Sequence, residues 1–306
     1  MEDNRLETVD EELLNEISDY NGEFKGAYNI RKNGKGIQRQ VTENINIVTK
    51  TDKPGIDIIV KPNTKFEFVH IPVILTESGL KDVVYNDFFI GKDANVIIIA
   101  GCGIHNDHHK NSQHDGIHRF FLEEGAKVKY IEKHYGEGAG DGKRILNPVT
   151  EVYLKSGSSM EMESVQIKGV DSAIRETKGV LEDNTNFVVT EKIMTHGKQS
   201  AQTCFDVQLN GENASTHVTS RSVATEDSYQ HFTSKIYGNS KCFAHSECDA
   251  IIKVKATPEI TANNVDANLI HEAAIGKIAG EQLTKLMTLG LSEKESEEQI
   301  INGFLR

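Results

Sequence analysis

The chain has 306 residues, enough for one large hydrophobic core or two domains, and its net charge of −12 argues against nucleic acid or an anionic membrane surface as the main partner. No apolar run approaches the roughly 20 residues that a membrane span needs, and the acidic start of the chain lacks the pattern of a signal peptide. Four cysteines without a secretion signal are typical of a reducing cytoplasm, where they are thiols or metal ligands.

The first 40 residues have a different character from those that follow. Residues 9–18, VDEELLNEIS, predict one short amphipathic helix, and KNGKG at 32–36 predicts a loop. From about residue 43, short runs rich in Val, Ile, Thr, Phe and Tyr alternate with polar turns, which is the pattern of β-strands. We therefore expect an N-terminal helical and loop segment at 1–40, a β core at 41–268 and a C-terminal helical region at 269–306.

A weak internal repeat runs through the β core. Each copy has an apolar residue, a turn rich in Gly, Asn or Asp, and a residue that opens the next strand. These opening residues recur every 27–32 positions, at Val96, Val128, Met160, Phe187, Ser215 and Phe243. Such a period predicts stacked β coils that bury their inner faces against one another, hence a solenoid. A two-sheet sandwich is the alternative for any sequence with many strands.

The densest group of histidines lies in CGIHNDHHKNSQHDGIH, residues 102–118. Cys102, His105, His108 and His109 belong to residue types that bind transition metals, so they are secondary candidates for a metal site. Their spacing matches no zinc motif, and the alternative is a polar surface excursion between two strands.

The stretch GEGAGDGKR at 136–144 has the composition of a phosphate loop but not its pattern. A P-loop has Gly five residues before its Gly-Lys pair and Ser or Thr after the Lys. This chain has Glu137 and Arg144 at those places. The stretch therefore predicts a flexible loop and no ATP site.

The stretch KCFAHSECDAIIKV contains two of the four cysteines. On a continuous strand, alternate side chains face opposite sides. One face then carries the small and apolar residues Cys242, Ala244, Ser246, Cys248, Ala250, Ile252 and Val254. We expect this face to point inward, which makes Cys242 and Cys248 buried and inert. Because six residues span about 20 Å of strand, the two thiols cannot share a metal unless a turn intervenes.

The tail of the chain changes to a helical pattern. In LIHEAAIGKIAGEQLTKL, residues 269–286, the apolar residues recur at helical spacing from Ile275 onward, and His271-Glu272 stands at the expected start of the helix. Gly290 fits a helix C′ position, and Ser292 with Glu295 fits a capping box that opens a second helix. We expect a helical hairpin that closes the β array.

Several of these stretches resemble the SufB and SufD scaffold proteins of the SUF iron–sulfur cluster assembly system. The tail, with ECDAIIKV before it and NLIHEAAIGKIAGEQLTKLMTLGLSEKESEEQIINGFL within it, is similar to the C-terminal part of that family. IRKNGKG, DKPGIDIIVKP and NSQHDGIHRF are similar to its short archaeal and anaerobe-type members. The resemblance implies a right-handed parallel β-helix between helical ends.

The resemblance also implies a function and a site. It implies a cytoplasmic, non-enzymatic scaffold that builds a transient iron–sulfur cluster with a SufC-type ABC ATPase and transfers the cluster to recipient apo-proteins. Cys248 and Glu272 correspond to the SufB residues tied to cluster assembly, and His271 corresponds to the SufD histidine. The chain is shorter than typical SufB and lacks its N-terminal Cys-rich motif, but Cys248 makes it SufB-like.

Two surfaces follow from the same resemblance. The ATPase is expected to dock on the C-terminal helical region, whose polar rim is Lys277, Glu281, Lys285, Glu293 and Glu297. Because one chain carries both Cys248 and His271, we expect a homodimer in which two copies fill both roles. The alternative function is a solitary β-solenoid that acts on or binds carbohydrate, and the absence of Trp argues against it.

Overall fold

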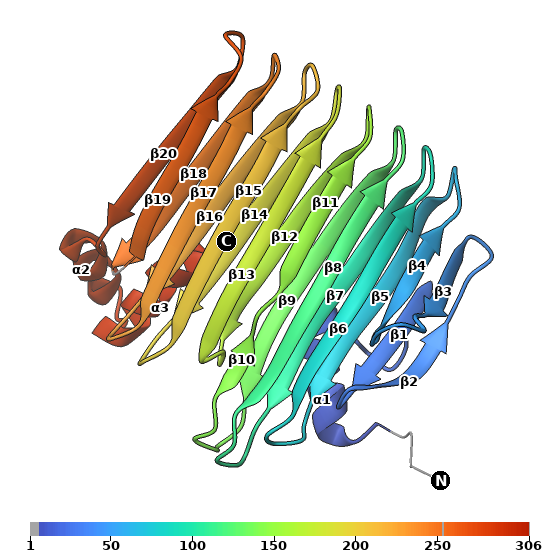
Figure 1. The fold of residues 1–306 in the computed structure, drawn as a ribbon. Helices are drawn as coiled ribbons and strands as arrows, with labels where there is room; N and C mark the ends of the chain where they lie inside the picture. Colours follow the sequence, from blue (N-terminus) through green and yellow to red (C-terminus); the bar gives the residue numbers. More distant parts are fainter. Residues whose placement is uncertain (1–5, 253, 306) are drawn as a thin grey trace.

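The protein, described here by a computed structural model, is a parallel β-solenoid (Figure 1). The structure describes residues 6–252 and 254–305. Two sheets of ten strands face each other, and each turn of the chain adds one level to both. The first sheet has the order β2 (Lys35–Gln40), β1 (Ala27–Lys32), β5 (Lys65–Leu75), β7 (Asn95–His105), β9 (Lys127–Glu137), β12 (Ser159–Lys168), β14 (Asn186–Thr195), β16 (Ser215–Ala224), β18 (Phe243–Ile252) and β20 (Asn268–Gly276).

The second sheet lies opposite the first. Its order is β19 (Val254–Ala262), β17 (Tyr229–Gly238), β15 (Ser200–Leu209), β13 (Ser172–Leu181), the short pair β10 (Arg144–Leu146) and β11 (Val149–Leu154), β8 (Ser112–Leu122), β6 (Lys81–Ile90), β4 (Gly55–Val60) and β3 (Ile45–Thr49). Among the strands of the described residues, only β1–β2 and β3–β4, at the N-terminal end, pair antiparallel. The solenoid predicted from the repeat is therefore confirmed.

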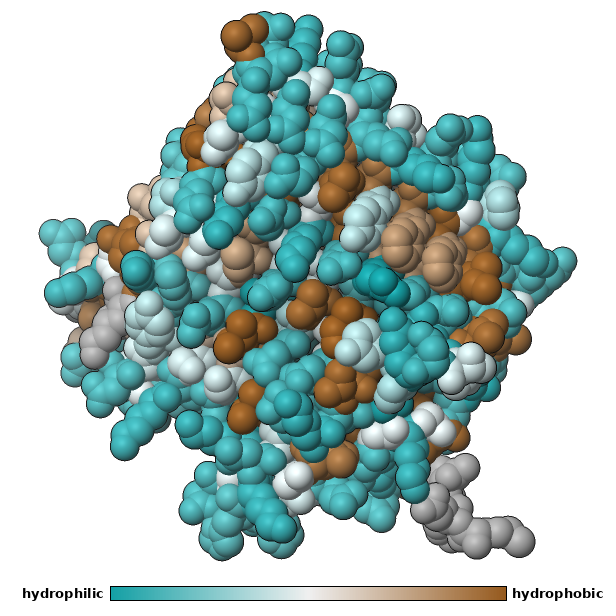
Figure 2. All heavy atoms as spheres, in the orientation of Figure 1, coloured by the Kyte–Doolittle hydropathy of each residue, from teal (hydrophilic) through white to brown (hydrophobic). Residues whose placement is uncertain are grey.

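The repeat follows from the turns and the alternation of side chains. The turns that lead into β7, β9, β12, β14 and β16 each contain one residue with positive φ, which is Asp93, Gly125, Gly157, Asn184 and Asn213 in that order. These residue types tolerate the left-handed conformation at low cost. Between the turns, buried and partly exposed residues alternate along each strand, so the apolar core lies between the sheets. Figure 2 shows the resulting outer surface, mostly hydrophilic with separate brown patches.

The predicted repeat register is correct for four copies and then slips by one residue. Val96, Val128, Met160 and Phe187 are stacked partners, as expected. The next partners are Thr216 and Ala244 rather than Ser215 and Phe243. The turn after β15 holds one extra residue, and the amides of Asn210 and Gly211 both donate to the carbonyl of Leu181.

The predicted N-terminal helix is confirmed as α1 (Thr8–Ser18). Its apolar residues Leu13, Leu14 and Ile17 are fully buried against the outer face of the first sheet. Gly101 and Gly103 of β7 make room there, because a Cβ at Gly101 would lie 2.6 Å from the carbonyl oxygen of Ile17.

The C-terminal part differs from the expected hairpin in where it begins and what it covers. Residues 268–276 form β20, so the helices begin only with α2 (Gly280–Thr288) and continue with α3 (Glu293–Phe304). The helical pattern predicted from Ile275 onward therefore included one residue, Ile275, that lies on β20. The expected C′ residue Gly290 and the capping box of Ser292 and Glu295 are both present.

The helices do not close the open end of the array. Ile301 and Leu305 at the end of the chain pack on Val223 and Ile251, which lie on the outer face of the first sheet. The strands β19 and β20 remain the last members of their sheets. At the other end, residues 27–40 contribute β1 and β2 to the first sheet, so the β core begins before residue 41. Their many polar residues suit an end strand that is half exposed. Among the described residues, no helix combines the length and apolar character needed to cross a membrane.

Candidate functional site

A column of inward-facing residues runs along the first sheet and includes Cys248. Because parallel strands stack in register, one position of every turn lines up with the same position of the next. The stacked partners are Ala100, Glu132, Ser164, Glu191, Ser220, Cys248 and Ala273. Cys248 is thus the last buried member of a mostly polar column that leads to the C-terminal end of the solenoid.

The charges of this column are compensated by an arginine from the opposite sheet. Arg175 of β13 is 2% exposed and forms an ion pair with Glu132, donates to His134 Nδ1 at 2.9 Å and lies 3.6 Å from Glu191 Oε2. Burial opposes ionisation of Glu132, but Arg175 outweighs it and lowers the pKa of Glu132 to about 2. Burial raises the pKa of Glu191, although Arg175 opposes it and Ser220 and Thr203 donate hydrogen bonds to its carboxyl group at 3.0 Å.

Cys248 lies fully buried on β18. Its neighbours on the same inward face are Ser246, which donates to Ser234 at 2.9 Å, and Ala250. Burial, reinforced by Glu191 and Asp249, raises the pKa of the Cys248 thiol to about 12. The thiol is therefore protonated at neutral pH, and a metal ion must displace that proton in order to bind.

His271 faces the same interior from the next strand. It is the register partner of Ser246, two positions from the partner of Cys248. Strand spacing and rise place the Cβ atoms of His271 and Cys248 about 8 Å apart. Both ring nitrogens of His271 are buried without a hydrogen-bond partner in the described part of the chain. Burial and the nearby His245 lower the pKa of His271, with Glu272 opposing, so the ring is neutral and open to a ligand.

Glu272 points to the opposite side of the sheet from Cys248. Its register partner is Glu247, on the outward face, and its side chain is 64% exposed. There His245 Nε2 lies 3.0 Å from Glu272 Oε2. The rings of His245 and His217 are nearly perpendicular, with their centroids 4.7 Å apart. The structure therefore places Cys248 and His271 on the same face of the sheet and Glu272 on the opposite face, because adjacent residues of a strand face opposite sides.

Cys242 and Cys248 are both buried, as expected, and β18 runs without a turn from Phe243 to Cys248, so the strand separates the two thiols. Burial raises the pKa of the Cys242 thiol. No disulfide is formed among the four cysteines. Nor do the described residues hold a group of three His, Cys, Asp or Glu side chains placed to bind a metal ion.

The structure divides the histidine segment 102–118 between the surface and the interior. His105 contacts Asp107 at 2.8 Å and Glu137 at 3.2 Å, and the exposed His109 contacts Asp141 at 2.6 Å. Cys102 instead lies inside the solenoid, where burial raises its pKa. The four secondary candidates, with His108 on the outer loop, are therefore not brought together. His114 and His118 are buried, so a surface excursion describes only part of the segment.

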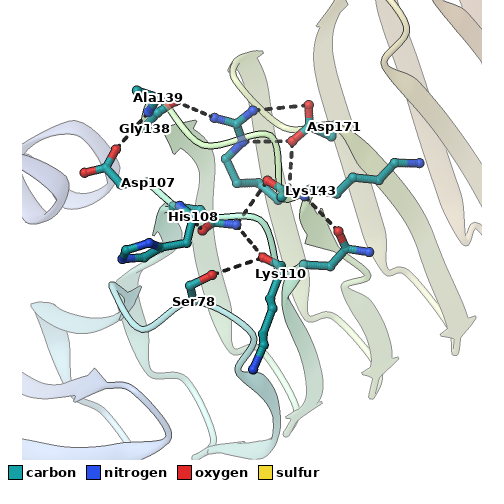
Figure 3. Close-up of polar contacts among 12 residues, drawn as sticks. Ser78, Asp107, His108, Lys110, Gly138, Ala139, Lys143 and Asp171 are labelled. Atoms are coloured by element: carbon teal, nitrogen blue, oxygen red, sulfur yellow. Dashed lines mark hydrogen bonds and ion pairs between the residues drawn. The ribbon is translucent and has the colours of Figure 1, made fainter.

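The loops at 106–111 and 138–143 stack on each other at one edge of the solenoid (Figure 3). Asp107 accepts a hydrogen bond from the amide of Ala139 at 2.8 Å. A Cβ at Gly140 would lie 2.3 Å from the backbone of His108, and one at Gly142 equally close to Lys110. Close backbone approach, rather than phosphate binding, thus explains the Gly-rich stretch.

The residues expected at the ATPase dock lie where the chain leaves the sheet. Lys277 precedes α2, Glu281 and Lys285 lie on α2, and Glu293 and Glu297 lie on α3. No described residue of α2 is buried. Leu283, Leu286 and Met287 leave an apolar stripe on α2, with Met287 45% exposed.

Sequence reasoning missed the polar column, although it identified the inward face of Cys248. The alternation of β18 was enough to turn Cys248 inward. Placing Glu132, Arg175 and Glu191 beside one another required the register between turns, which slips where a turn gains a residue. The detectable signal was a charged residue at an inward position of each of three β runs.

Comparisons with known proteins agree on one family. A family model described as the SUF system FeS cluster assembly, SufBD core domain, matches residues 91–304. An iron–sulfur cluster assembly SufBD family protein of Methanocaldococcus jannaschii is 27% identical over 299 residues, which cover 92% of this chain and 90% of that protein. One from Pyrococcus horikoshii is 26% identical, covering 81% and 77%, and one from Porphyra purpurea is 24% identical, covering 64% and 43%.

Proposed function

The chain belongs to the SufBD family of iron–sulfur cluster assembly proteins, and from that premise we propose that it is a cytoplasmic scaffold on which a cluster is built and from which it is handed to recipient proteins. A SufC-type ABC ATPase supplies the ATP hydrolysis, and this chain is not itself an enzyme. The cluster is the cargo of the scaffold, so its ligands must hold it and then release it.

The observation that carries this proposal is that Cys248 and His271 lie on the same inward face of neighbouring strands. Thiolate and imidazole are both ligands of iron–sulfur clusters. The two side chains share the inward face of neighbouring strands, and the ring nitrogens of His271 have no other partner in the described structure. A separation of about 8 Å between their Cβ atoms is one that a cluster between the side chains can bridge.

The proposed site is completed at the open end of the solenoid. One chain supplies a thiol and an imidazole, so we propose that a second copy supplies the remaining ligands across the exposed edges of β19 and β20. Glu272 reaches a cluster only from the outer face, where His245 holds its carboxylate. We therefore assign Glu272 to the outer rim of the site, as a weaker and more exchangeable ligand.

The test compares two cysteines of the same strand region. The protein is co-expressed with its ATPase partner and purified without oxygen, and iron and acid-labile sulfide are measured. Cys248→Ala is expected to abolish the cluster, whereas Cys242→Ala, on the same inward face, is expected to leave it unchanged. Normal iron and sulfide in a folded Cys248→Ala protein would contradict the proposal.

The stacked aromatic row on the outside of the second sheet does not favour the alternative of a carbohydrate-active solenoid. Phe89, Phe121 and Tyr153 form an outer aromatic row on the second sheet, with ring centroids 5.3 and 5.1 Å apart and nearly parallel planes. Both faces of Phe121 are therefore covered by its neighbours, whereas a sugar platform needs an open ring face.

A further inference from the structure

A cavity of about 320 Å³ lies at the N-terminal end of the solenoid, opposite the end that carries Cys248. It is enclosed by β1, β2 and the β3–β4 hairpin, and its floor is made by β5 and β6. Pockets for small ligands begin at about this volume. The charged residues that line it are Arg31, Arg39, Lys50 and Lys53, all of them cations, in a chain of net charge −12.

Two of these four cations are already neutralised. Arg31 forms a two-pronged ion pair with Asp82, at 2.9 and 2.6 Å. Lys50 pairs with Asp57 and lies 2.7 Å from Asp87, which Arg119 also binds. The three carboxylates of Asp57, Asp82 and Asp87 thus balance the charges of Arg31, Lys50 and Arg119.

The other two cations carry charge that the described part of the chain does not balance. Arg39 donates only to neutral acceptors: Asn29 Oδ1 at 3.1 Å, Thr49 Oγ1 at 2.8 Å and the carbonyl of Ile47 at 3.3 Å. These bonds hold its guanidinium group across the gap between β2 and β3. Lys53 lies over the ring of Tyr85, 4.7 Å from the centroid, and has no carboxylate partner among the described residues. Both charges therefore remain available to an anion in the cavity.

One buried amide at the cavity has an acceptor that a ligand can use. Tyr130 donates its hydroxyl hydrogen to Glu132, so its oxygen accepts from His118 Nδ1 at 2.7 Å. His118 Nε2 is then an acceptor, and it takes the amide hydrogen of Asn86 at 3.4 Å. This leaves Asn86 Oδ1, on a side chain that is 3% exposed and lines the cavity, without a donor among the described residues. An unpaired buried acceptor destabilises the protein, and a ligand hydroxyl group that donates to it offsets this cost.

We propose that this cavity binds a small polyanion that carries a hydroxyl group. Arg39 and Lys53 hold its phosphate or carboxylate groups, and Asn86 accepts a hydrogen bond from its hydroxyl group. The shared chemistry is met by two sources, phosphate esters of small polyols and hydroxylated polycarboxylates. The proposal does not depend on the cluster-scaffold function, because none of these residues lies near Cys248.

Calorimetric titration of the full-length protein tests it, with inorganic phosphate, glycerol 3-phosphate and citrate as separate probes at low ionic strength. Glycerol 3-phosphate or citrate is expected to bind more tightly than inorganic phosphate, and whichever binds identifies the source. Lys53→Gln and Arg39→Gln are each expected to weaken that binding about tenfold. Lys198→Gln, which removes an exposed cation from the β14–β15 turn, is the matched control and leaves it unchanged.

The role of the amide has its own readout. Asn86→Ala is expected to abolish the preference for the hydroxylated anion over inorganic phosphate. Because Arg39 also joins two end strands, Lys53→Gln is the decisive charge variant, since its side chain only covers Tyr85. Equal affinity in the wild type and Lys53→Gln, or no binding of any of the three probes at millimolar concentration, would overturn the proposal.

Discussion

Arg175 is a buried charge whose partners all lie on the opposite sheet. Removing its guanidinium group leaves Glu132 and Glu191 buried without compensation, and breaking a buried pair in this way costs about 3–5 kcal/mol. We expect Arg175→Met to lower the free energy of unfolding by that amount in urea denaturation. Arg221→Met, on the outer face of β16, is the matched control and is expected to change it by about 0.5 kcal/mol or less. Similar losses in the two variants would contradict this account.

His118 makes the stability depend on pH. Burial lowers the pKa of His118 from 6.5 to about 4, against the opposing charge of Glu132. The unfolded chain therefore binds a proton before the folded protein does, and stability is lost as the pH falls from about 6.5 towards 4. The shift corresponds to about 3 kcal/mol.

The measurement is the urea midpoint across that pH range. His118→Gln is expected to flatten the decline, whereas His109→Gln, at a side chain that is 89% exposed, is expected to leave it unchanged. Asn86, Tyr130, His114 and the Glu132–Arg175 pair surround His118. Burial also lowers the pKa of His134 to about 3, so His134 adds a loss of stability over the same pH range. The depressed pKa of Glu132 adds its own loss of stability only below about 4.5. An unchanged slope in His118→Gln would show that other groups dominate.

At the scale of elements, α2 is the helix that contributes no buried residue to the fold. Its apolar residues are available to a partner, whereas α3 is held against the sheet by Ile301 and Leu305. We propose that the SufC-type ATPase docks on α2, within the rim from Lys277 to Glu297. The single substitutions Met287→Glu on α2 and Leu289→Glu at the exposed residue that ends it are each expected to abolish co-purification with the ATPase without loss of stability.

The control for that experiment is Val265→Glu, at the fully exposed turn between β19 and β20. It adds the same charge at another exposed apolar residue and is expected to leave co-purification intact. Undiminished binding by both α2 variants would place the dock elsewhere.

The elements that sequence reasoning identified are those with a strong local signal. Alternation turned Cys248 inward, and the capping box of Ser292 and Glu295 marked the start of α3. What failed was non-local. Residues 27–40 and 268–276 are end strands with one neighbouring level, so their polar or helix-like composition hid their role. The outward orientation of Glu272 was missed for the same reason, because adjacent side chains point in different directions at the start of a helix and on a strand.

At the scale of the whole molecule, the C-terminal end of the solenoid presents two uncovered strand edges. β19 and β20 each pair with a neighbouring strand along one edge only. Ile260, Ile270 and Ile275 on these strands are 39–48% exposed. Such edges pair with other strands unless they are covered. We propose a two-fold dimer through these edges, so that light scattering at micromolar concentration gives twice the mass of the chain.

A proline tests this dimer. Ala273→Pro removes one backbone amide from the exposed edge of β20 and is expected to give a monomer. Val265→Glu is the control and is expected to leave the dimer intact, since Val265 lies at the turn between the two strands rather than along their edges. A wild-type protein of monomer mass would contradict the dimer.

Because the turns stack at equal spacing, the number of turns sets the distance between the two ends of the solenoid. Each turn advances the first sheet by one strand spacing of about 4.8 Å. Seven such steps separate β5, at the floor of the N-terminal cavity, from β20, which carries His271, so the two ends lie about 34 Å apart. Adding or removing a whole turn changes this distance by one step and leaves both ends intact, whereas a change of one residue within a strand turns the later side chains of that strand to the wrong face.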